Sequence, residues 1–217
     1  MDSLPEPLPH TPLALFEQWF REARELHSRP NPDAMVLAST TAEGRPSARV
    51  VLCKRIDAAA GYLVFFTNYQ SRKARELLAN PYAAGVFHWD SMHRQVRVEG
   101  RIVLSPPQES DAYFASRALD SRIGAWASQQ SQPLASRAAL AEQVVHASHR
   151  LGIAPGATTG VVPRPAHWGG FRLWLESVEL WMEGPNRIHD RAVWSRHLEP
   201  RASEFDAGPW SATRLNP

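Results

Sequence analysis

Apolar residues near the start of the chain recur with the period of an α-helix. The residues on this stripe are Leu13, Phe16, Trp19, Phe20, Ala23 and Leu26. Their spacing places them on one face of a helix. Thr11 and Pro12 are typical of a helix cap and of a first helical position. We therefore predict an amphipathic helix from Pro12 to about His27, after an irregular proline-rich segment over residues 1–11.

Short β-like runs separated by turn signals follow this helix. We predict strands over residues 34–40, 48–56, 62–67, 82–89 and 95–104. In the last run Val96 and Val98 alternate with polar residues, the pattern of a half-buried strand. Residues 171–175 alternate in the same way, and short runs at 193–194 and 211–215 are expected to close the sheet.

Helical patterns interrupt these runs. We predict helices over residues 71–79, 107–116 and 121–128, and another around residues 140–151. Residues 152–167 are rich in Gly, Pro and Thr, so we expect a long surface loop. Strands at hairpin spacing with peripheral helices favour a mainly β (α+β) antiparallel barrel, a single domain over residues 12–217, rather than a parallel α/β sheet. The sequence has no Gly-rich strand-to-helix turn of the Rossmann or P-loop type.

The composition is that of a soluble globular protein, because hydrophobic residues make up 43% and charged residues 21% of the 217 positions. No apolar run approaches the ~18 residues of a membrane span, and the N-terminus lacks the features of a signal peptide. The single cysteine, Cys53, excludes an intrachain disulfide, so we expect a cytoplasmic protein. The nine histidines show no closely spaced ligand pattern, which argues against a metal site.

Charge is distributed unevenly along the chain. The net charge of +2 is too small to indicate a nucleic-acid partner, but nine basic and three acidic residues lie between Arg45 and Arg97. The only two lysines, Lys54 and Lys73, fall in this stretch. A local positive field suits a small anionic ligand, while a solvated basic face is the alternative. Lysines kept in so arginine-rich a chain indicate a need for a compact ammonium group, unless they are there by chance.

The segment from Thr67 to Lys73 contains the best local signal for an anion site. Ser71 is a candidate helix cap, followed at once by Arg72 and Lys73. Free backbone N–H groups and the helix dipole favour an anion at such a position, whereas two cations there oppose the dipole. A capped surface helix with solvated basic side chains is the alternative interpretation.

Two further groups of polar residues have spacings that bear on phosphate binding. Arg49 and Lys54 lie at the ends of an apolar strand and point to opposite faces unless a bulge intervenes. Tyr113, Arg117 and Ser121 lie four residues apart, so on one helix they would line a single face. Strand-end solubility charges and incidental polar residues are the alternatives.

Three candidate cations lie close together near the C-terminus. Strand alternation would put Arg187, His189 and Arg191 on one face. They would repel one another there unless an anion lay over them. His189 is a candidate proton carrier or hydrogen-bonding group. A cross-strand salt-bridge face with Glu179 or Glu183 is the alternative.

Taken together, these segments resemble the pyridoxine/pyridoxamine 5'-phosphate oxidase family. The similarity runs from Pro12 to Pro217, and the joint order and spacing of the motifs make it specific. The motifs are RVVLCK at 49–54, FFTNYQSRK at 65–73, Gln95-Val96, YFASRALDSRIGAW at 113–126, Gln130-Ser131, WGGFR at 168–172, RIHDR at 187–191 and RLNP at 214–217.

The resemblance implies an antiparallel split β-barrel and a homodimer with flavin mononucleotide (FMN) at its interface. The positions implied to contact FMN are Arg49, Val50, Val51, Leu52, Phe66, Thr67, Arg72, Lys73, Gln95, Gln130, Ser131, Trp181 and Arg191. The positions implied to bind the substrate are Lys54, Tyr113, Arg117, Ser121, Arg187 and His189. Arg187 and His189 are expected to flank the reacting carbon.

The resemblance also implies the reaction. Pyridoxamine 5'-phosphate and pyridoxine 5'-phosphate would be oxidised to pyridoxal 5'-phosphate, with O2 as acceptor, H2O2 as product and ammonia released from the amine. The flavin would accept a hydride while protein groups orient the reactants. Neither Arg187 nor His189 is expected to be an essential base.

Some positions depart from the family pattern. Only eleven residues precede Pro12 and none is Arg or Tyr, so we do not expect a complete substrate lid. Met182 replaces a more usual polar residue, and the stretches 154–166 and 199–208 are individual to this chain.

Three other functions fit parts of the sequence. A flavin oxidase of the same fold that acts on another substrate, such as a phenazine precursor, is one of them. It would not need the residues implied to hold the substrate's phosphate, which are Lys54, Tyr113, Arg117 and Ser121. A protein that binds FMN or pyridoxal phosphate without turnover would show the same binding residues. A nucleic-acid-binding barrel would need a basic stripe with exposed aromatic residues.

Overall fold

The computed structural model describes residues 3–26, 30–202 and 204–217. Helix α1 spans Leu13–Glu25, and the predicted last residue, His27, lies outside the described residues. The helix begins one residue later than predicted because Pro12 takes the cap position. Thr11 Oγ1 accepts a hydrogen bond from Leu13 N at 3.3 Å. Phe16 and Phe20 of α1 pack edge-on against Phe87, with ring centroids 5.3 and 5.9 Å apart, so this helix covers part of the core.

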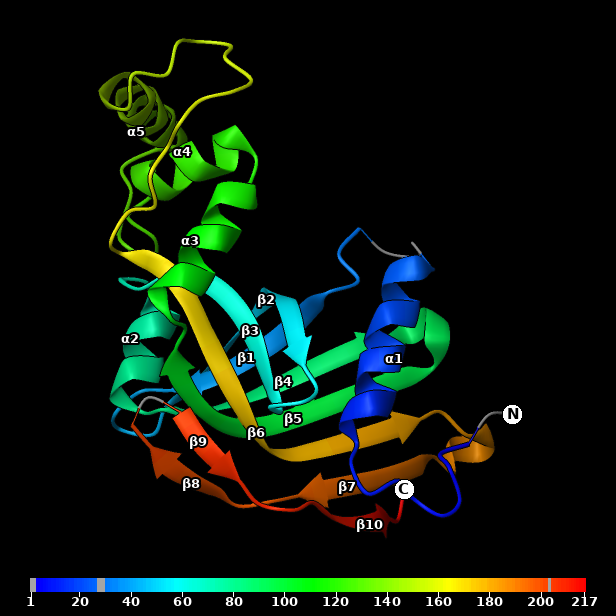
Figure 1. Cartoon of the computed structure of the whole chain (residues 1–217). Helices are drawn as coiled ribbons and strands as arrows, with labels where there is room; N and C mark the ends of the chain where they lie inside the picture. Colours follow the sequence, from blue (N-terminus) through cyan, green and yellow to red (C-terminus); the bar gives the residue numbers. More distant parts are fainter. Residues whose placement is uncertain (1–2, 27–29, 203) are drawn as a thin grey trace.

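Six antiparallel strands close into a barrel, which confirms the predicted fold class (Figure 1). They are β1 (Ala34–Thr40), β2 (Pro46–Asp57), β3 (Tyr62–Asn68), β4 (Tyr82–Trp89), β5 (Arg94–Leu104) and β6 (Trp168–Met182). Their order around the barrel is β6-β3-β2-β1-β4-β5, and pairing between β5 and β6 closes it. Phe65, Phe87 and Phe171 are fully buried in its core.

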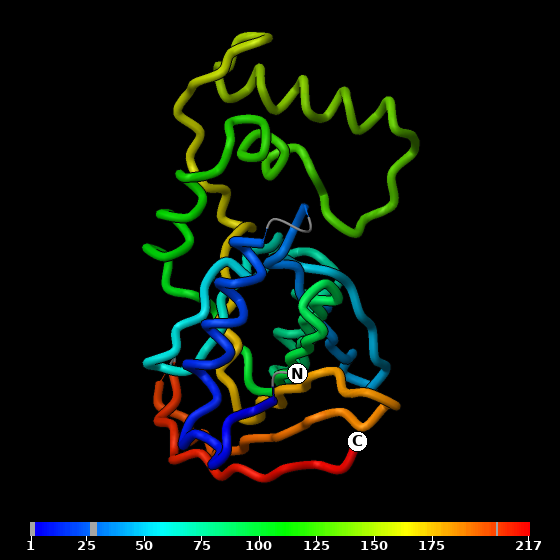
Figure 2. Tube along the Cα trace, turned by 90° about the vertical axis from the view of Figure 1, so that its right-hand side faces the viewer, coloured from blue at the N-terminus to red at the C-terminus, as the bar shows by residue number. Residues whose placement is uncertain are grey.

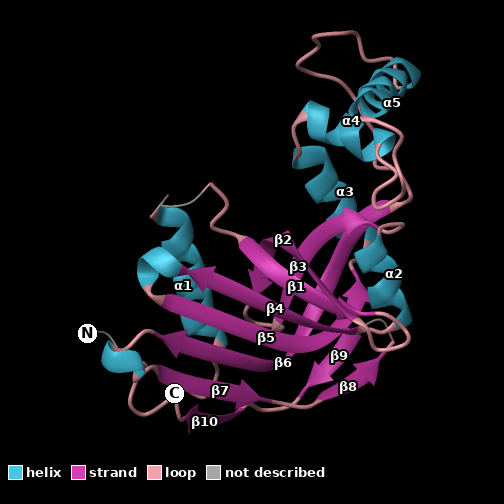
Figure 3. Cartoon of the chain, turned by 180° about the vertical axis from the view of Figure 1, so that it is seen from behind, coloured by secondary structure: helices cyan, strands magenta, loops and turns pink. Residues whose placement is uncertain are grey.

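Strand β6 belongs to both the barrel and an outer sheet. It pairs with β3 from Trp168 to Trp174, and with β7 (Asp190–Ser195) from Ser177 to Met182. Strand β10 (Ser211–Leu215) then pairs with β7 at the edge, as the view from behind shows (Figure 3). The expectation that the last two runs close the sheet is therefore wrong, because they extend it while β5 and β6 close the barrel.

A β-bulge marks the point where β6 leaves the barrel. The β5–β6 register shifts between Glu99, which pairs with Ser177, and Gly100, which pairs with Leu175. A bulge bends the strand that carries the extra residue. A Cβ atom on Gly100 would lie 1.8 Å from the carbonyl oxygen of Trp174, so the two backbones approach too closely for any side chain.

The remaining α-helices lie on the side of the barrel where β6 begins (Figures 1 and 2). They are α2 (Arg72–Ala79), which contacts β1, and the arm formed by α3 (Pro107–Ser116), α4 (Leu119–Ala127) and α5 (Arg137–Arg150). A second hydrophobic cluster, which includes Phe114, Leu119, Ile123 and Trp168, joins this arm to the barrel. The predicted loop at 152–167 contains no helix or strand. No helix among the described residues is long and apolar enough to cross a membrane.

The segment before α1 packs against the outer sheet, although residues 3–12 form neither helix nor strand. Leu4 N donates a hydrogen bond to Asp190 Oδ2 at 2.7 Å, and Arg214 pairs with Glu6 at 2.9 Å. A small hairpin of β8 (Leu198–Arg201) and β9 (Glu204–Ala207) was not predicted. Its strands are short and mostly exposed, so they lack the apolar alternation that marks a half-buried strand.

Candidate active site

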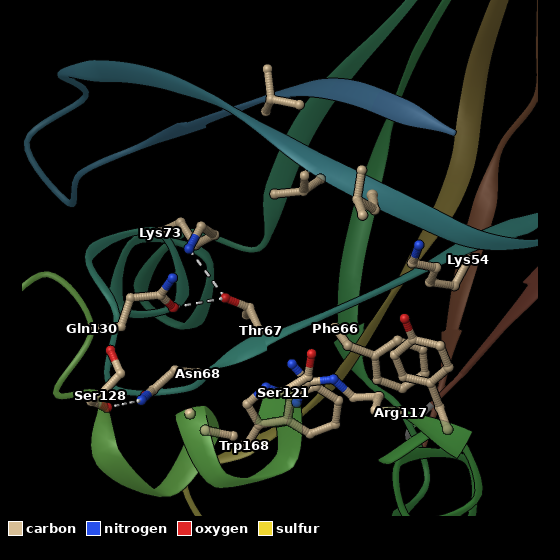
Figure 4. Close-up of a pocket in the computed structure, with 16 residues that line it drawn as sticks. Lys54, Phe66, Thr67, Asn68, Lys73, Arg117, Ser121, Ser128, Gln130 and Trp168 are labelled. Atoms are coloured by element: carbon tan, nitrogen blue, oxygen red, sulfur yellow. Dashed lines mark hydrogen bonds between the residues drawn. The ribbon is translucent and has the colours of Figure 1, made fainter. Parts of the chain in front are cut away.

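A cavity of about 460 Å³ lies where β2 and β3 face the helical arm (Figure 4). The predicted site residues that line it are Val50, Val51, Leu52, Lys54, Phe66, Thr67, Lys73, Tyr113, Arg117, Ser121 and Gln130. Lys73, Thr67 and Gln130 gather on one side of it, and Lys54 and Arg117 lie on the other (Figure 4). Folding thus brings together positions that are far apart in the sequence.

The first side of the cavity is built on the start of α2. Ser71 caps this helix as predicted, since its Oγ accepts a hydrogen bond from Ala74 N at 3.4 Å. Lys73 Nζ donates to Thr67 Oγ1 at 3.1 Å, and Thr67 Oγ1 donates to Gln130 Oε1 at 3.3 Å. Burial and the nearby Arg49 lower the pKa of Lys73 below its ordinary value. An anion beside Lys73 would favour its charged form.

Aromatic rings form one wall of the cavity. Phe66 stacks on Tyr113 with ring centroids 4.0 Å apart, and Trp168 lies parallel to Phe66 at 5.6 Å. The sequence motifs did not single out Trp168 as a cavity residue, although it begins the WGGFR segment. Asn68 and Ser128 were also missed, and Asn68 Nδ2 donates to the carbonyl oxygen of Ser128 at 3.3 Å.

Arg117 sits at a break between two helices. Helix α3 ends at Ser116 and α4 begins at Leu119, with Arg117 in an extended conformation between them. The separate helices predicted at 107–116 and 121–128 are confirmed, so Tyr113, Arg117 and Ser121 do not share one helical face. The break nevertheless directs all three side chains to the same cavity.

The guanidinium group of Arg117 is held over a ring and is incompletely bonded. Its Cζ lies 4.7 Å from the centroid of Trp168. Its Nη1 is buried and has no hydrogen-bond partner among the described residues. Burial lowers the pKa of Arg117, while Tyr113 opposes this shift. Because unpaired buried donors are costly, this atom is suited to an anionic ligand.

Lys54 reaches the cavity from a bulged strand. The β2–β3 register shifts between Cys53 and Arg55, so Lys54 is the extra residue. Its Nζ forms a salt bridge with Asp33 Oδ2 at 2.6 Å. Arg49, five residues earlier on the same strand, does not line the cavity.

Six of the thirteen positions implied to contact FMN lie outside the cavity lining, and three of these six are Arg49, Arg72 and Ser131. Arg49 Nη2 and Arg72 Nε instead bind the carboxylate of Glu76, at 3.1 and 2.8 Å. Ser131 is exposed, with a φ angle of 70°. Arg49 nevertheless lies close enough to Lys73 to lower the pKa of that ammonium group, so the two cations are neighbours.

The other predicted residues form a second cluster at the far end of β6. Gln95 pairs with Trp181 across β5 and β6, and the Trp181 ring lies 4.6 Å from the His189 ring. Arg191 pairs with Glu179 at 3.0 Å, the cross-strand salt bridge that the sequence left as an alternative. Arg187 is exposed.

The prediction that Arg187, His189 and Arg191 share one face of a strand is wrong. Residues Pro185–Arg187 form a short 3-10 turn, and β7 begins only at Asp190. Arg187 has a positive φ of 64°, so the local backbone is not a strand. Gly184 N donates a hydrogen bond to His189 Nδ1 at 3.2 Å. This contact assigns the ring proton of a neutral His189 to Nε2.

The cavity contains the groups needed to hold phosphate esters beside a flat ring. It offers ammonium, guanidinium and hydroxyl donors on two sides and an aromatic wall, and its donors suit phosphate oxygens. Within residues 3–26, 30–202 and 204–217, no three His, Cys, Asp or Glu side chains are placed to hold a metal ion. Binding and orientation by charge and hydrogen bonding are therefore what this chain's own cavity residues can provide.

Two family models together match most of the chain. The model described as pyridoxamine 5'-phosphate oxidase matches residues 21–150, and that of the pyridoxine 5'-phosphate oxidase C-terminal dimerisation region matches residues 168–217. A protein named pyridoxine/pyridoxamine 5'-phosphate oxidase from Burkholderia lata is 48% identical over 96% of this chain and 90% of its own length. A protein of the same name from Rhodospirillum rubrum is 48% identical over 95% of this chain and 96% of its own length.

Solved structures share the fold. PhzG from Burkholderia lata, crystallised with tetrahydrophenazine-1-carboxylic acid, superposes with a TM-score of 0.79 at 30% identity, over 96% of this chain and 94% of that one. An FMN-binding protein from Nostoc punctiforme related to pyridoxamine 5'-phosphate oxidase superposes with a TM-score of 0.67 at 16% identity, over 94% and 96% of the two chains.

Proposed function

Because the chain belongs to the pyridoxamine 5'-phosphate oxidase family, we propose that it is an FMN-dependent oxidase of pyridoxamine 5'-phosphate and pyridoxine 5'-phosphate. The products are pyridoxal 5'-phosphate and H2O2, with O2 as the acceptor and ammonia released from the amine. The observation that carries this proposal is the convergence of Lys54, Tyr113, Arg117 and Ser121 on one cavity.

The substrate's phosphate is assigned to this group of four residues. Arg117 brings a buried, unpartnered Nη1, and Lys54 brings an ammonium group whose only described partner is Asp33. Tyr113 and Ser121 add hydroxyl donors. A phosphate monoester has the charge and the acceptor oxygens to satisfy them together.

Lys73, Thr67 and Gln130 would hold FMN on the other side of the cavity. Lys73 supports this fit, because its Nζ donates only to hydroxyl groups among the described residues and has no carboxylate partner there. Bound FMN supplies the two-electron redox chemistry. The protein's residues bind it, orient the substrate and keep water from the reacting atoms.

A second copy of the chain would complete the site. Trp168 begins β6 and Trp181 lies near its end, so at about 3.3 Å per residue the strand path between them is about 40 Å. The far cluster of Gln95, Trp181, Arg187, His189 and Arg191 would therefore reach the cavity only from a partner subunit. The family's dimerisation region, residues 168–217, contains all of these residues except Gln95.

Within that composite site, His189 and Arg187 would face the reacting part of the substrate. The hydrogen bond from Gly184 N to Nδ1 leaves the Nε2–H of neutral His189 free to donate to a substrate oxygen or nitrogen. The exposed guanidinium of Arg187 would orient the substrate through its several donors. We assign positioning and proton handling to these residues.

The second candidate is oxidation of a phenazine precursor, which the similarity to PhzG favours. Such a substrate has a carboxylate but no phosphate ester. Its carboxylate would occupy only some of the donors of Lys54, Tyr113, Arg117 and Ser121. Dependence on the substrate phosphate therefore distinguishes the two functions.

The test is peroxide formation by the purified protein loaded with FMN. We expect turnover of pyridoxamine 5'-phosphate and a kcat/KM at least about 100-fold lower for pyridoxamine, which lacks the phosphate. Flavin binding without turnover would indicate a binding protein. Faster oxidation of a reduced phenazine carboxylate than of pyridoxamine 5'-phosphate would establish the second candidate instead.

A further inference from the structure

Helix α2 carries a buried carboxylate that no sequence motif singled out. Glu76 is only 5% exposed. It accepts hydrogen bonds from Ser39 Oγ at 2.5 Å and Ser47 Oγ at 2.6 Å, on β1 and β2. It also binds Arg49 Nη2 at 3.1 Å and Arg72 Nε at 2.8 Å. One side chain therefore links a helix, two strands and two of the cations near Lys73.

This network keeps Glu76 ionised. Burial opposes its charge, but hydrogen bonds from Ser39, Ser47, Arg72 and Arg49 prevail and lower its pKa to about 2. Glu76 thus carries a full negative charge at neutral pH. With Arg49, Arg72 and Lys73 the group has a net charge of +2, which matches the charge of a phosphate monoester of about −2.

The two arginines are fixed by Glu76 in different ways. Both terminal nitrogens of Arg49 are engaged, with Leu37 O and Ser39 through Nη1 and with Ser47 and Glu76 through Nη2. Arg72 is held only through Nε, and its side chain is 60% exposed. Its two terminal amino groups have no partner among the described residues, so these donors are free at the start of α2, the turn that also carries Lys73.

We propose that Glu76 is the positioning residue for the phosphate-binding end of the flavin site. It aims the free donors of Arg72 and holds Arg49 beside Lys73, so that the cations are in place before the ligand arrives. This inference rests on the proposed FMN function. A site whose charged groups are fixed in advance binds its ligand more tightly, because less ordering is needed on binding.

A purely architectural role predicts something different. Through Ser39 and Ser47, Glu76 also anchors α2 to the barrel. If that were its whole role, its loss would weaken binding of any flavin, with or without a phosphate. A positioning role affects the phosphate alone, so the ratio of FMN to riboflavin affinity separates the two.

The experiment compares wild-type protein with Glu76→Gln by titrating each flavin and following the quenching of flavin fluorescence. We expect the Kd for FMN to rise about 10-fold, the size of effect seen when a group that orients a ligand-binding residue is lost. The Kd for riboflavin should change less than about 2-fold, because riboflavin lacks the phosphate. Glu109→Gln is the matched control.

Glu109 also bridges two arginines, Arg55 at 3.2 Å and Arg172 at 3.0 Å, but neither of them lines the cavity. Its loss should leave the FMN-to-riboflavin ratio unchanged. If Glu76→Gln does not fold, Glu76→Asp withdraws the carboxylate by one methylene and should reduce the same ratio to a smaller extent.

Two results would overturn the assignment. One is a ratio of FMN to riboflavin affinity that is the same in the folded Glu76 variant as in the wild type. The other is tighter FMN binding by that variant than by the wild type. Failure of the proposed FMN function looks different, because wild-type protein would then bind FMN no better than riboflavin.

Discussion

Trp168 and Trp181 lie on the same strand but belong to different clusters. Trp168 lines the cavity and stacks with Phe66, whereas Trp181 packs against His189 near the other end of β6. In the proposed composite site, these two clusters are half-sites that the fold of one chain keeps apart. In a symmetric dimer, each copy can offer its far cluster to the cavity of the other.

Mixing two inactive variants tests this arrangement. Arg117→Ala damages the cavity and Arg187→Ala damages the far cluster, so each alone should lose most of its activity. A mixed dimer has one site with both defects and one site with neither. Random re-assembly of equal amounts should therefore restore about a quarter of the wild-type kcat/KM for pyridoxamine 5'-phosphate.

The control is the same mixture of the two variants without denaturation and refolding. Its dimers keep their original subunits, so this mixture should stay inactive. Absence of recovery after refolding, with dimers present, would mean that both half-sites act within one chain.

Arg117 is expected to determine affinity for the substrate's phosphate. Its Nη1 is buried and unpartnered among the described residues, so a phosphate oxygen is its natural acceptor. Arg117→Ala should raise the KM for pyridoxamine 5'-phosphate by about 10- to 100-fold, from the loss of a hydrogen bond to a charged group. FMN affinity should stay within about 2-fold, since the residues assigned to FMN are on the other side of the cavity.

Arg122→Ala is the matched control for this change. Arg122 lies on the same helical arm, but its Nη1 donates to the carbonyl oxygen of Gly160 at 3.2 Å and it does not line the cavity. It should leave both KM and flavin affinity near their wild-type values. If Arg117→Ala releases FMN while the KM is unchanged, the roles of the two sides are reversed.

Local features of the site could be predicted from the sequence, and long-range ones could not. The cap at Ser71 depends on residues only a few positions away, so its pattern is visible in the sequence. The break between the helices on either side of Arg117 was also predicted, because it too depends on a local pattern. Glu76 was missed because its partners Ser39 and Ser47 are 37 and 29 positions away, and only the β1–β2 hairpin brings them to it.

Gly100 should be intolerant of any side chain. In the β5–β6 bulge a Cβ atom there would lie 1.8 Å from the backbone oxygen of Trp174, and a backbone atom cannot rotate away. Gly100→Ala should lower the free energy of unfolding by about 3 kcal/mol, the upper range for overpacking. Chemical denaturation followed by tryptophan fluorescence measures this.

Gly124→Ala serves as the comparison. Gly124 lies in helix α4, and a Cβ there would meet nothing within 4 Å. It should raise the free energy of unfolding by about 1 kcal/mol through helix propensity. Equal effects of the two substitutions would show that the β5–β6 backbones are less tightly apposed than the structure has them.

Glu76 should contribute to the acid sensitivity of the fold. Its pKa is lowered from 4.5 to about 2 in the folded protein, so the folded state binds this proton less readily than the unfolded state. The resulting stability is present above pH 4.5 and is lost as the pH falls toward about 2. Glu76→Gln removes the titrating group, so its free energy of unfolding should fall less than that of the wild type between pH 5 and about 3. Urea unfolding at several pH values measures the difference, and parallel pH profiles for the two proteins would show that Glu76 is not held ionised by Ser39 and Ser47.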